Sequence, residues 1–271
     1  MAQTDRMDVG GRVERRFEAV REVFGRVLAG QAGTGAAVAA WWDGAWVVDL
    51  WGGWADAAGS RRWGAGSLVQ PYSVSKPFAA VCALVLADRG QLELGLDFLV
   101  GLTAAEQARA VELTGVAEYS QEQQAAGRPE LYQRAVANLP GAFDPAVVNG
   151  SAWRAAEVPA VNGHGTARGA AGLYAALLRA ELLSPALLAE ATTAQCSGVD
   201  AVFGQHSAWG LGFGVSADGF GMGGSGGSYA GACTVGGYAF ACMTGTMGSH
   251  ARATMVENAF RGCLGMPPLD E

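Results

Sequence analysis

Lysine is nearly absent from this chain of 271 residues, where it occurs once against seventeen arginines. The two cations serve equally well as surface charges, but only lysine can lose its proton inside a protein. The single lysine, Lys76, stands three positions after Ser73 in the segment Ser73-Val74-Ser75-Lys76. This placement predicts that Lys76 works as a neutral amine beside the serine hydroxyl, a role that arginine could not fill.

Long hydrophobic runs and a basic stripe are also missing. No stretch approaches about 18 uninterrupted apolar residues, and residues 1–16 are polar and charged, so the sequence predicts neither a membrane span nor an export signal. The formal net charge is −7 and the isoelectric point is near 5.0. Such a charge disfavours nucleic acid and anionic membranes as partners. We therefore expect a cytoplasmic protein that acts on a small molecule.

Cysteine is sparse and lacks the spacing of disulfide or zinc sites. The five cysteines are odd in number and form no C-x-x-C pair, a pattern typical of reduced thiols packed in the core. They are Cys82, Cys196, Cys233, Cys242 and Cys263. The glycine-rich segment 223–227 is not followed by the G-K-[ST] of a phosphate-binding loop. We expect neither a metal nor a cofactor.

The hydrophobic pattern predicts helices and strands that follow one another in blocks. The strongest local signal is Asp43-Gly44 between two β-rich runs, which predicts a hairpin. The expected strands are 36–42, 45–51, 208–216, 228–235 and 238–244. The expected helices are 11–29, 73–89, 104–114 with a Thr103–Glu106 capping box, 129–138, 166–179, 184–192 and 249–263.

This order of elements favours the α+β class, with one antiparallel sheet flanked by helices. The chain is long enough to bury a substantial core as one domain, which we expect to span residues 1–271. The terminal helices should cover one face of the sheet, and the helix that follows Ser73 should cover the other.

The spacing of Ser73 and Lys76 carries the strongest chemical signal. In a helix that begins near Ser73, residues i and i+3 share a face, so the amine can lie beside the hydroxyl. The positive end of the same helix would face a developing oxyanion. Residues 78–86 are apolar all round, as expected of a helix buried in the domain centre. This S-x-x-K arrangement is typical of serine nucleophiles that attack acyl carbonyls.

Four segments together resemble the serine β-lactamase and penicillin-binding-protein superfamily, and within it the class C-like esterase branch. They are Val47–Asp56, Ser73–Lys76, Asn162–Gly169 and the glycine-rich Phe220–Ser228. The resemblance implies a β-lactamase/transpeptidase-like fold. It also implies Ser73 as nucleophile, Lys76 as its base, and an oxyanion hole formed by the Ser73 N–H and a second N–H from the strand near Ser225.

The chain departs from that family at two motifs. In the family a helical subdomain carries a catalytic tyrosine. Here we expect a direct join near Leu94-Gly95 in place of that subdomain, and Tyr119 and Tyr132 in the connector lack the tyrosine motif. The third motif falls on Met222-Gly223-Gly224, and methionine neither donates a hydrogen bond nor carries a proton. We therefore expect a reduced helical subdomain over 95–160, between segments 1–94 and 161–271, and no β-lactam hydrolysis.

Loss of the subdomain should leave a wide apolar cleft between the sheet and the serine helix. The oxyanion and third-motif region would comprise Met222, Gly224 and Ser225. The candidates for the cleft lining are Trp51, Trp54, Tyr72, Tyr119, His164, Phe220 and Tyr229. The other two histidines, His206 and His250, have no partner pattern and are expected at the surface.

Three functions remain open at this point. The first is serine-dependent acyl chemistry, either hydrolysis or transacylation, on a small apolar ester, lactone or acyl donor of specialised metabolism. The second is a non-hydrolytic cyclase or isomerase that uses the opened cavity. The third is a catalytically dead binding module or homodimer whose cleft is filled by a partner, since large apolar patches are rarely left exposed.

Overall fold

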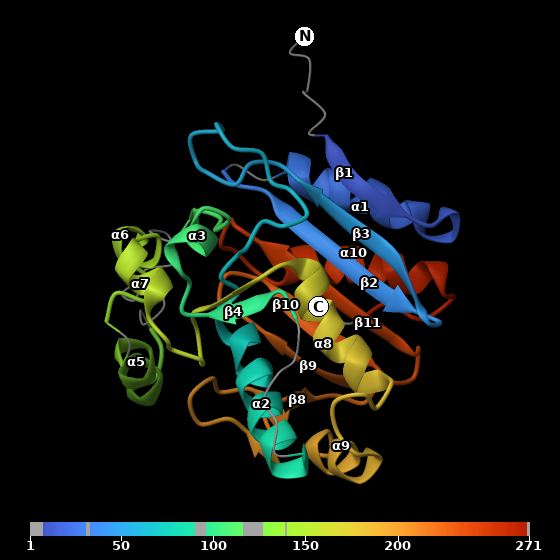
Figure 1. The fold of residues 1–271 in the computed structure, drawn as a ribbon. Coiled ribbons are helices and arrows are strands. Elements are labelled where there is room, and N and C mark those ends of the chain that lie inside the picture. The colour runs from blue at the N-terminus through green and yellow to red at the C-terminus, as the bar shows by residue number, and fades with distance from the viewer. Residues whose placement is uncertain (1–7, 31–32, 90–95, 116–126, 139, 270–271) are drawn as a thin grey trace.

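One large antiparallel sheet organises the molecule (Figure 1). The computed structural model describes residues 8–30, 33–89, 96–115, 127–138 and 140–269. The nine strands lie in the order β1-β3-β2-β11-β10-β9-β8-β7-β6. Their bounds in chain order are β1 Val9–Val13, β2 Ala36–Trp42, β3 Ala45–Gly52, β6 Cys196–Val199, β7 His206–Trp209, β8 Gly214–Val215, β9 Gly219–Gly223, β10 Tyr229–Cys233 and β11 Tyr238–Thr244.

The predicted hairpin forms one half of this sheet. Strands β2 and β3 join through Asp43 and Gly44, whose φ angles of 49° and 80° lie in the left-handed region that a tight hairpin turn requires. Strand β2 also pairs with β11, the strand predicted at 238–244. The hairpin therefore links the start of the chain to its end.

Helices cover both faces of the sheet, as predicted. Helices α1 (Glu18–Ala29) and α10 (Ala251–Cys263) lie on one face, and α2 (Ser75–Arg89) and α8 (Ala167–Leu178) lie on the other (Figure 1). Because side chains alternate along a strand, β2 contributes its even residues to the core under α1 and α10 and its odd residues to the core under α8. The predicted α+β class and antiparallel sheet are confirmed.

The first predicted helix begins too early. Residues 9–13 form β1, which pairs with β3, and a short 3-10 turn, η1 (Arg15–Phe17), precedes α1. The helical spacing of apolar residues holds only from Phe17 onward. Upstream, Gly11 has a φ of 95°, which a helix cannot accommodate, and Val13 pairs with Val48 at the sheet edge.

The late strands are more numerous than predicted. The expected strand 208–216 is two strands, β7 and β8, and neither β6 nor β9 was predicted. Strand β9 contains three glycines in five residues, a composition that disfavours a strand by local propensity. Strand β6, at the edge of the sheet, carries the exposed Cys196, so the expectation that all five cysteines lie in the core is wrong for this one.

Short elements make up the connector between the serine helix and α8. They are β4 (Phe98–Val100), α3 (Ala104–Gln107), α5 (Glu130–Ala137), α6 (Pro145–Val148), α7 (Ser151–Ala155) and β5 (Gly163–Gly165). Helix α9 (Pro185–Ala191) follows α8. The join expected near Leu94-Gly95 lies outside the described residues.

The capping box at Thr103 and Glu106 is present, but α3 ends at Gln107 instead of residue 114. The chain leaves the helix because Leu68 accepts a hydrogen bond from the Val111 N–H and donates one to the Arg109 carbonyl. A tertiary β-bridge thus replaces the helical continuation. Among the described helices, none combines the length and apolar character needed to cross a membrane.

Candidate active site

Ser73 and Lys76 meet at the start of α2. Ser73 lies in the 3-10 turn η2 (Tyr72–Val74), and α2 begins two residues later. The Lys76 Nζ donates a hydrogen bond to the Ser73 Oγ over 2.7 Å. Burial lowers the pKa of Lys76, because an apolar environment disfavours the charged ammonium form. The predicted pairing of amine and hydroxyl is therefore present in the structure.

A backbone carbonyl is the second partner of the amine. The Lys76 Nζ donates to the Ala160 carbonyl oxygen over 2.9 Å, although the two residues are 84 positions apart. The sequence analysis missed Ala160, because a carbonyl acceptor leaves no signature in the side-chain pattern. The two acceptors hold the amine at a defined position next to the serine.

The residue before the serine has a strained backbone. Tyr72 has a φ of 49°, in the left-handed region that non-glycine residues rarely adopt, and such strain is common at functional sites. Its phenol donates to the Ala142 carbonyl over 2.9 Å, and its ring stacks on Phe143 with centroids 5.5 Å apart. Burial raises the pKa of Tyr72 above its ordinary value. Tyr72 thus supports the serine turn and keeps its own proton.

The turn after β9 comes against the serine from the opposite side. An added Cβ on Gly224 would overlap the Pro71 carbonyl oxygen and lie 3.4 Å from the Ser73 nitrogen. Gly224 is therefore required for this close approach. Among the described residues, neither the Ser73 N–H nor the Ser225 N–H is used in a hydrogen bond. These two donors suit an oxyanion hole.

The third-motif position is apolar in the structure, as predicted. The Met222 side chain is buried, and because it stands two residues from Phe220 on β9 it lies on the same face of the sheet. Behind the motif, an added Cβ on Gly223 would lie 2.7 Å from the His250 Nε2, so the imidazole packs on the backbone there. Burial lowers the pKa of His250, while the carbonyls of Ser228 and Gly224 oppose that shift. His250 is exposed as predicted, but it also supports the turn that carries Ser225.

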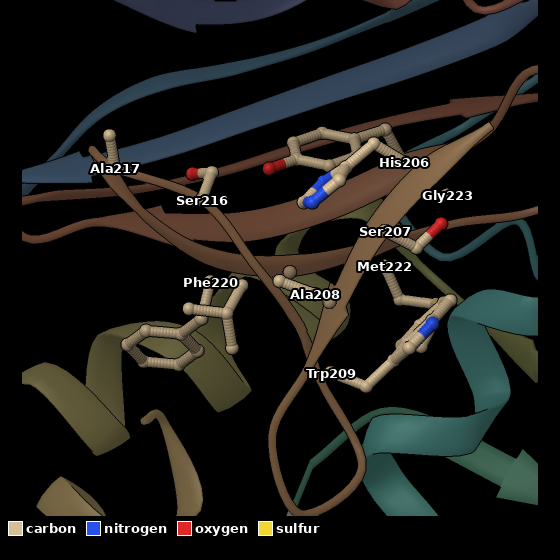
Figure 2. Close-up of a pocket in the computed structure, with 13 residues that line it drawn as sticks. His206, Ser207, Ala208, Trp209, Ser216, Ala217, Phe220, Met222 and Gly223 are labelled. Atoms are coloured by element: carbon tan, nitrogen blue, oxygen red, sulfur yellow. The ribbon is translucent and has the colours of Figure 1, made fainter. Parts of the chain in front are cut away.

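A pocket of about 620 Å³ opens between β7 and β9. Figure 2 shows Trp209 and Met222 on the side of helix α2, and His206 and Ser216 across the strands from them. The loop between β7 and β8 is held against α2, since an added Cβ on Gly212 would overlap Ala80. The lining includes two predicted cleft residues, Phe220 and Tyr229, and the third-motif residue Met222, whereas Ser73 and Lys76 are not part of it.

The comparison with known families agrees with this geometry. The sequence profile of the family described as Beta-lactamase matches residues 20–98 and 102–260, which is most of the chain. The chain belongs to the Beta-lactamase family. The match extends across α2, α8 and the strands β9–β11, so it includes Ser73, Lys76 and the glycine-rich turn.

Individual relatives of this Beta-lactamase family member are distant or partial. A curated protein described as Esterase/beta-lactamase LipL, from Mycobacterium tuberculosis (strain ATCC 25618 / H37Rv), is 39% identical over 85 residues. That match spans 31% of this chain and 20% of the relative, so the chain covers only a small part of the relative's length.

Solved structures share the fold over nearly the whole chain. A family VIII carboxylesterase has a TM-score of 0.80 and 22% identity, with 94% of this chain and 100% of that chain covered. A penicillin-binding-protein homologue from Caulobacter crescentus has a TM-score of 0.76 and 23% identity, with the same coverage of both chains. The fold of this Beta-lactamase family member is therefore the β-lactamase-like fold predicted from the sequence.

Some predicted site residues lie elsewhere. Trp51 is on β3, which the strands β2, β11 and β10 separate from β9. Trp54 lies beyond the end of β3, where the Arg62 guanidinium packs 3.9 Å from its ring centroid. Neither tryptophan lines the described pocket, because three strands separate β3 from β9 and Trp54 lies beyond the end of β3. Tyr119 lies outside the described residues.

His164 is buried on β5 and lies away from the pocket lining. Burial, followed by the nearby charge of Arg154, lowers its pKa to about 4. The imidazole is thus neutral at neutral pH, and its Nδ1 has no hydrogen-bond partner within the described part of the chain. The second connector tyrosine, Tyr132, packs edge-on against Phe203 with ring centroids 5.8 Å apart.

Proposed function

We propose that this protein is a serine hydrolase that cleaves small apolar carboxylic esters through an acyl-enzyme on Ser73. The observation that carries the proposal is the 2.7 Å hydrogen bond between the Lys76 Nζ and the Ser73 Oγ. Burial lowers the pKa of the amine, which favours the neutral form that a general base requires. Membership of the Beta-lactamase family and the esterase-like fold support the same chemistry.

In the proposed first step, the neutral Lys76 amine accepts the Ser73 hydroxyl proton while the Oγ attacks the ester carbonyl carbon. The carbonyl electron pair moves to the oxygen, which the Ser73 and Ser225 N–H groups stabilise. The tetrahedral intermediate then collapses, the bond to the alcohol oxygen breaks, and the Lys76 ammonium returns the proton to that oxygen. An alcohol leaves and the acyl-enzyme remains.

In the second step, water attacks the acyl carbon and Lys76 accepts its proton. Collapse of this intermediate returns that proton to the Ser73 Oγ and releases a carboxylic acid. If an alcohol or amine takes the place of water, the same cycle gives acyl transfer, because only the resolving nucleophile differs. Hydrolysis is the reaction we propose for dilute aqueous conditions, in which water is the abundant nucleophile.

The third-motif position supports an uncharged, apolar substrate group. Met222 is buried and apolar there, and Gly224, two residues further along, contacts the serine turn. Burying a carboxylate there would cost several kcal/mol without a cationic partner. A β-lactam carboxylate would meet Met222 where relatives offer a polar group, so we propose an ester substrate in preference to a β-lactam.

An active-site-directed fluorophosphonate tests the proposal directly. We expect an intact-mass shift of one phosphonyl group on the wild-type protein and none on Ser73→Ala. Hydrolysis of p-nitrophenyl acetate should depend on the same residue. A wild-type protein that neither labels at Ser73 nor cleaves esters would overturn the hydrolase and favour the binding or isomerising function.

A further inference from the structure

A buried asparagine closes the loop that presents the Ala160 carbonyl to Lys76. The Asn162 side chain is fully buried and its Oδ1 accepts the Val158 N–H over 2.9 Å. Its Nδ2 donates to the carbonyls of Trp153 and Ala156 over 3.0 and 2.7 Å. One side chain therefore satisfies three backbone groups, and it fixes the residues on both sides of the exposed segment that contains Ala160.

A buried serine connects this loop to the nucleophile turn. Ser75 is fully buried, and its Oγ donates to the Tyr72 carbonyl over 2.6 Å. The same oxygen accepts the Gly163 N–H over 3.0 Å. Because Gly163 follows Asn162, this single hydroxyl joins the residue before the nucleophile to the end of the loop. The two halves of the site are thereby held in register, although they are 88 positions apart.

We propose that Asn162 and Ser75 are positioning residues, which hold the Ala160 carbonyl against the Lys76 amine and keep that amine aligned with Ser73. The inference rests on the proposed function, since it concerns the base of the same reaction. Neither side chain is bonded to the Ser73 Oγ or the Lys76 Nζ in the structure. The methionine at position 222 cannot orient the amine, so the carbonyl is the partner left to do so.

Loosening the loop would change the acid–base behaviour of the amine. Burial is the cause of the lowered pKa of Lys76. Within the described part of the chain no charged or titratable side chain is a cause of that shift, and this includes Tyr72 on η2, Arg154 on α7, His164 on β5 and His250 before α10. Water that enters an opened loop would restore solvation of the ammonium form. The pKa of Lys76 would then rise, and less neutral amine would be present at neutral pH.

The test is the pH dependence of kcat/KM for p-nitrophenyl acetate in Asn162→Ala. We expect a loss of about tenfold at neutral pH for each unit by which the pKa of the base rises. We also expect recovery to near the wild-type rate at alkaline pH, where the amine is neutral again. A general weakening of the fold would instead lower the rate by the same factor at every pH.

Asn149→Ala is the matched control. Like Asn162, Asn149 bonds backbone groups through its side-chain amide. Its Oδ1 accepts the Leu113 N–H over 2.8 Å, and its Nδ2 donates to the Leu113 carbonyl over 2.9 Å. The hydrogen bonds of Asn149 go to Leu113 and Pro145 and not to the Ala160 loop, so the substitution should cost stability and leave the acidic limb of the pH profile in place. The comparison separates positioning from stability.

Ser75→Ala and Ser75→Thr test the second connection, and they carry the test alone if Asn162→Ala does not fold. Ser75→Ala should move the acidic limb upward, and Ser75→Thr, which keeps the hydroxyl, should restore it. If the acidic limb of the kcat/KM profile is unchanged in both Asn162→Ala and Ser75→Ala, the positioning proposal is overturned. The proposed function is unaffected by that result if the fluorophosphonate still labels Ser73. If the fluorophosphonate does not label the wild-type protein, the proposed function itself is overturned.

Discussion

At the scale of single residues, the chemistry we propose depends on the protonation of one amine. Lys76 has two acceptors, the Ser73 Oγ and the Ala160 carbonyl oxygen, and burial lowers its pKa. A base with a lowered pKa is neutral over a wider pH range, so activity should rise with pH through the shifted pKa and then level off. Arginine carries its charge throughout that range.

Lys76→Arg is therefore expected to abolish ester hydrolysis as fully as Ser73→Ala, because a guanidinium cannot accept the hydroxyl proton. For catalytic groups that act as a unit, the loss is typically at least about 10³-fold in kcat. Steady-state kinetics with p-nitrophenyl acetate measures it, with thermal melting as the check on folding. Wild-type turnover in a folded Lys76→Arg variant would refute the role of the amine.

Met222 provides a second test at this scale. In the wild-type protein, kcat/KM should rise with the acyl chain length of the ester by up to about fourfold per methylene, since each buried methylene contributes about 0.8 kcal/mol. Met222→His should flatten this rise, because it places a polar ring in the wall of the pocket.

The exposed Met255 on α10 offers the matched control, since Met255→His makes the same chemical change far from the pocket. It should leave the chain-length series unchanged. An identical slope in wild type and Met222→His would show that the acyl chain binds elsewhere.

At the scale of elements, the site depends on the meeting of η2 with the turn between β9 and β10. The Gly224 N–H donates to the Ser228 carbonyl over 2.8 Å, and the Gly227 N–H donates to the Gly224 carbonyl over 3.1 Å, so the turn is closed on itself. The Arg252 guanidinium supports it from behind by donating to the Gly226 carbonyl over 3.1 Å. This fixed turn holds Gly224 against the serine turn and so positions the Ser225 N–H that we propose for the oxyanion hole.

Gly224→Ala should displace the turn, because its Cβ would overlap the Pro71 carbonyl. We expect kcat to fall by about 10²-fold or more, the usual effect of losing one oxyanion donor. Gly262→Ala on α10, where an added Cβ meets no atom within 4 Å, should leave kcat unchanged. Comparable kcat values for the two variants would exclude the turn from the oxyanion hole.

At the scale of the whole molecule, a buried polar cluster joins α10 to the sheet. The Tyr238 Oη donates to the Glu257 Oε1 over 2.8 Å, and Arg261 donates to the Tyr238 Oη over 3.2 Å and to Asp218 over 2.8 Å. Burial raises the pKa of Glu257 to about 7, against an ordinary value of 4.5. Between these two values the folded protein binds a proton that the unfolded chain does not.

Stability should therefore fall as the pH rises from about 4.5 through 7, with a loss on the order of 2–3 kcal/mol from this group. Glu257→Gln should flatten this part of the curve, because the amide does not titrate. Urea unfolding at a series of pH values measures the slope, with Glu22→Gln on the exposed face of α1 as the control. A slope that survives Glu257→Gln would assign it to other groups.

The sequence predicted most of the fold through local signals. The hairpin at Asp43-Gly44, the serine helix and β11 lie at or within a residue or two of their predicted bounds, because turn chemistry and apolar periodicity act over a few residues. The helices predicted at 11–29 and 104–114 were wrong at one end each, because pairing with a distant segment replaced the local helical preference at β1 and after α3.

What the sequence determined by itself is the reactive pair and the fold class. The spacing of Ser73 and Lys76 on one helical turn is a local property, and so is the absence of a polar side chain at Met222. The tertiary structure decided which backbone groups complete the site. The Ala160 carbonyl comes to Lys76, and the turn of Gly224 and Ser225 comes to the serine turn, from segments far along the chain, and every residue type carries such backbone groups. No side-chain pattern can mark them, so only the packing of the loop and the turn against α2 places them there.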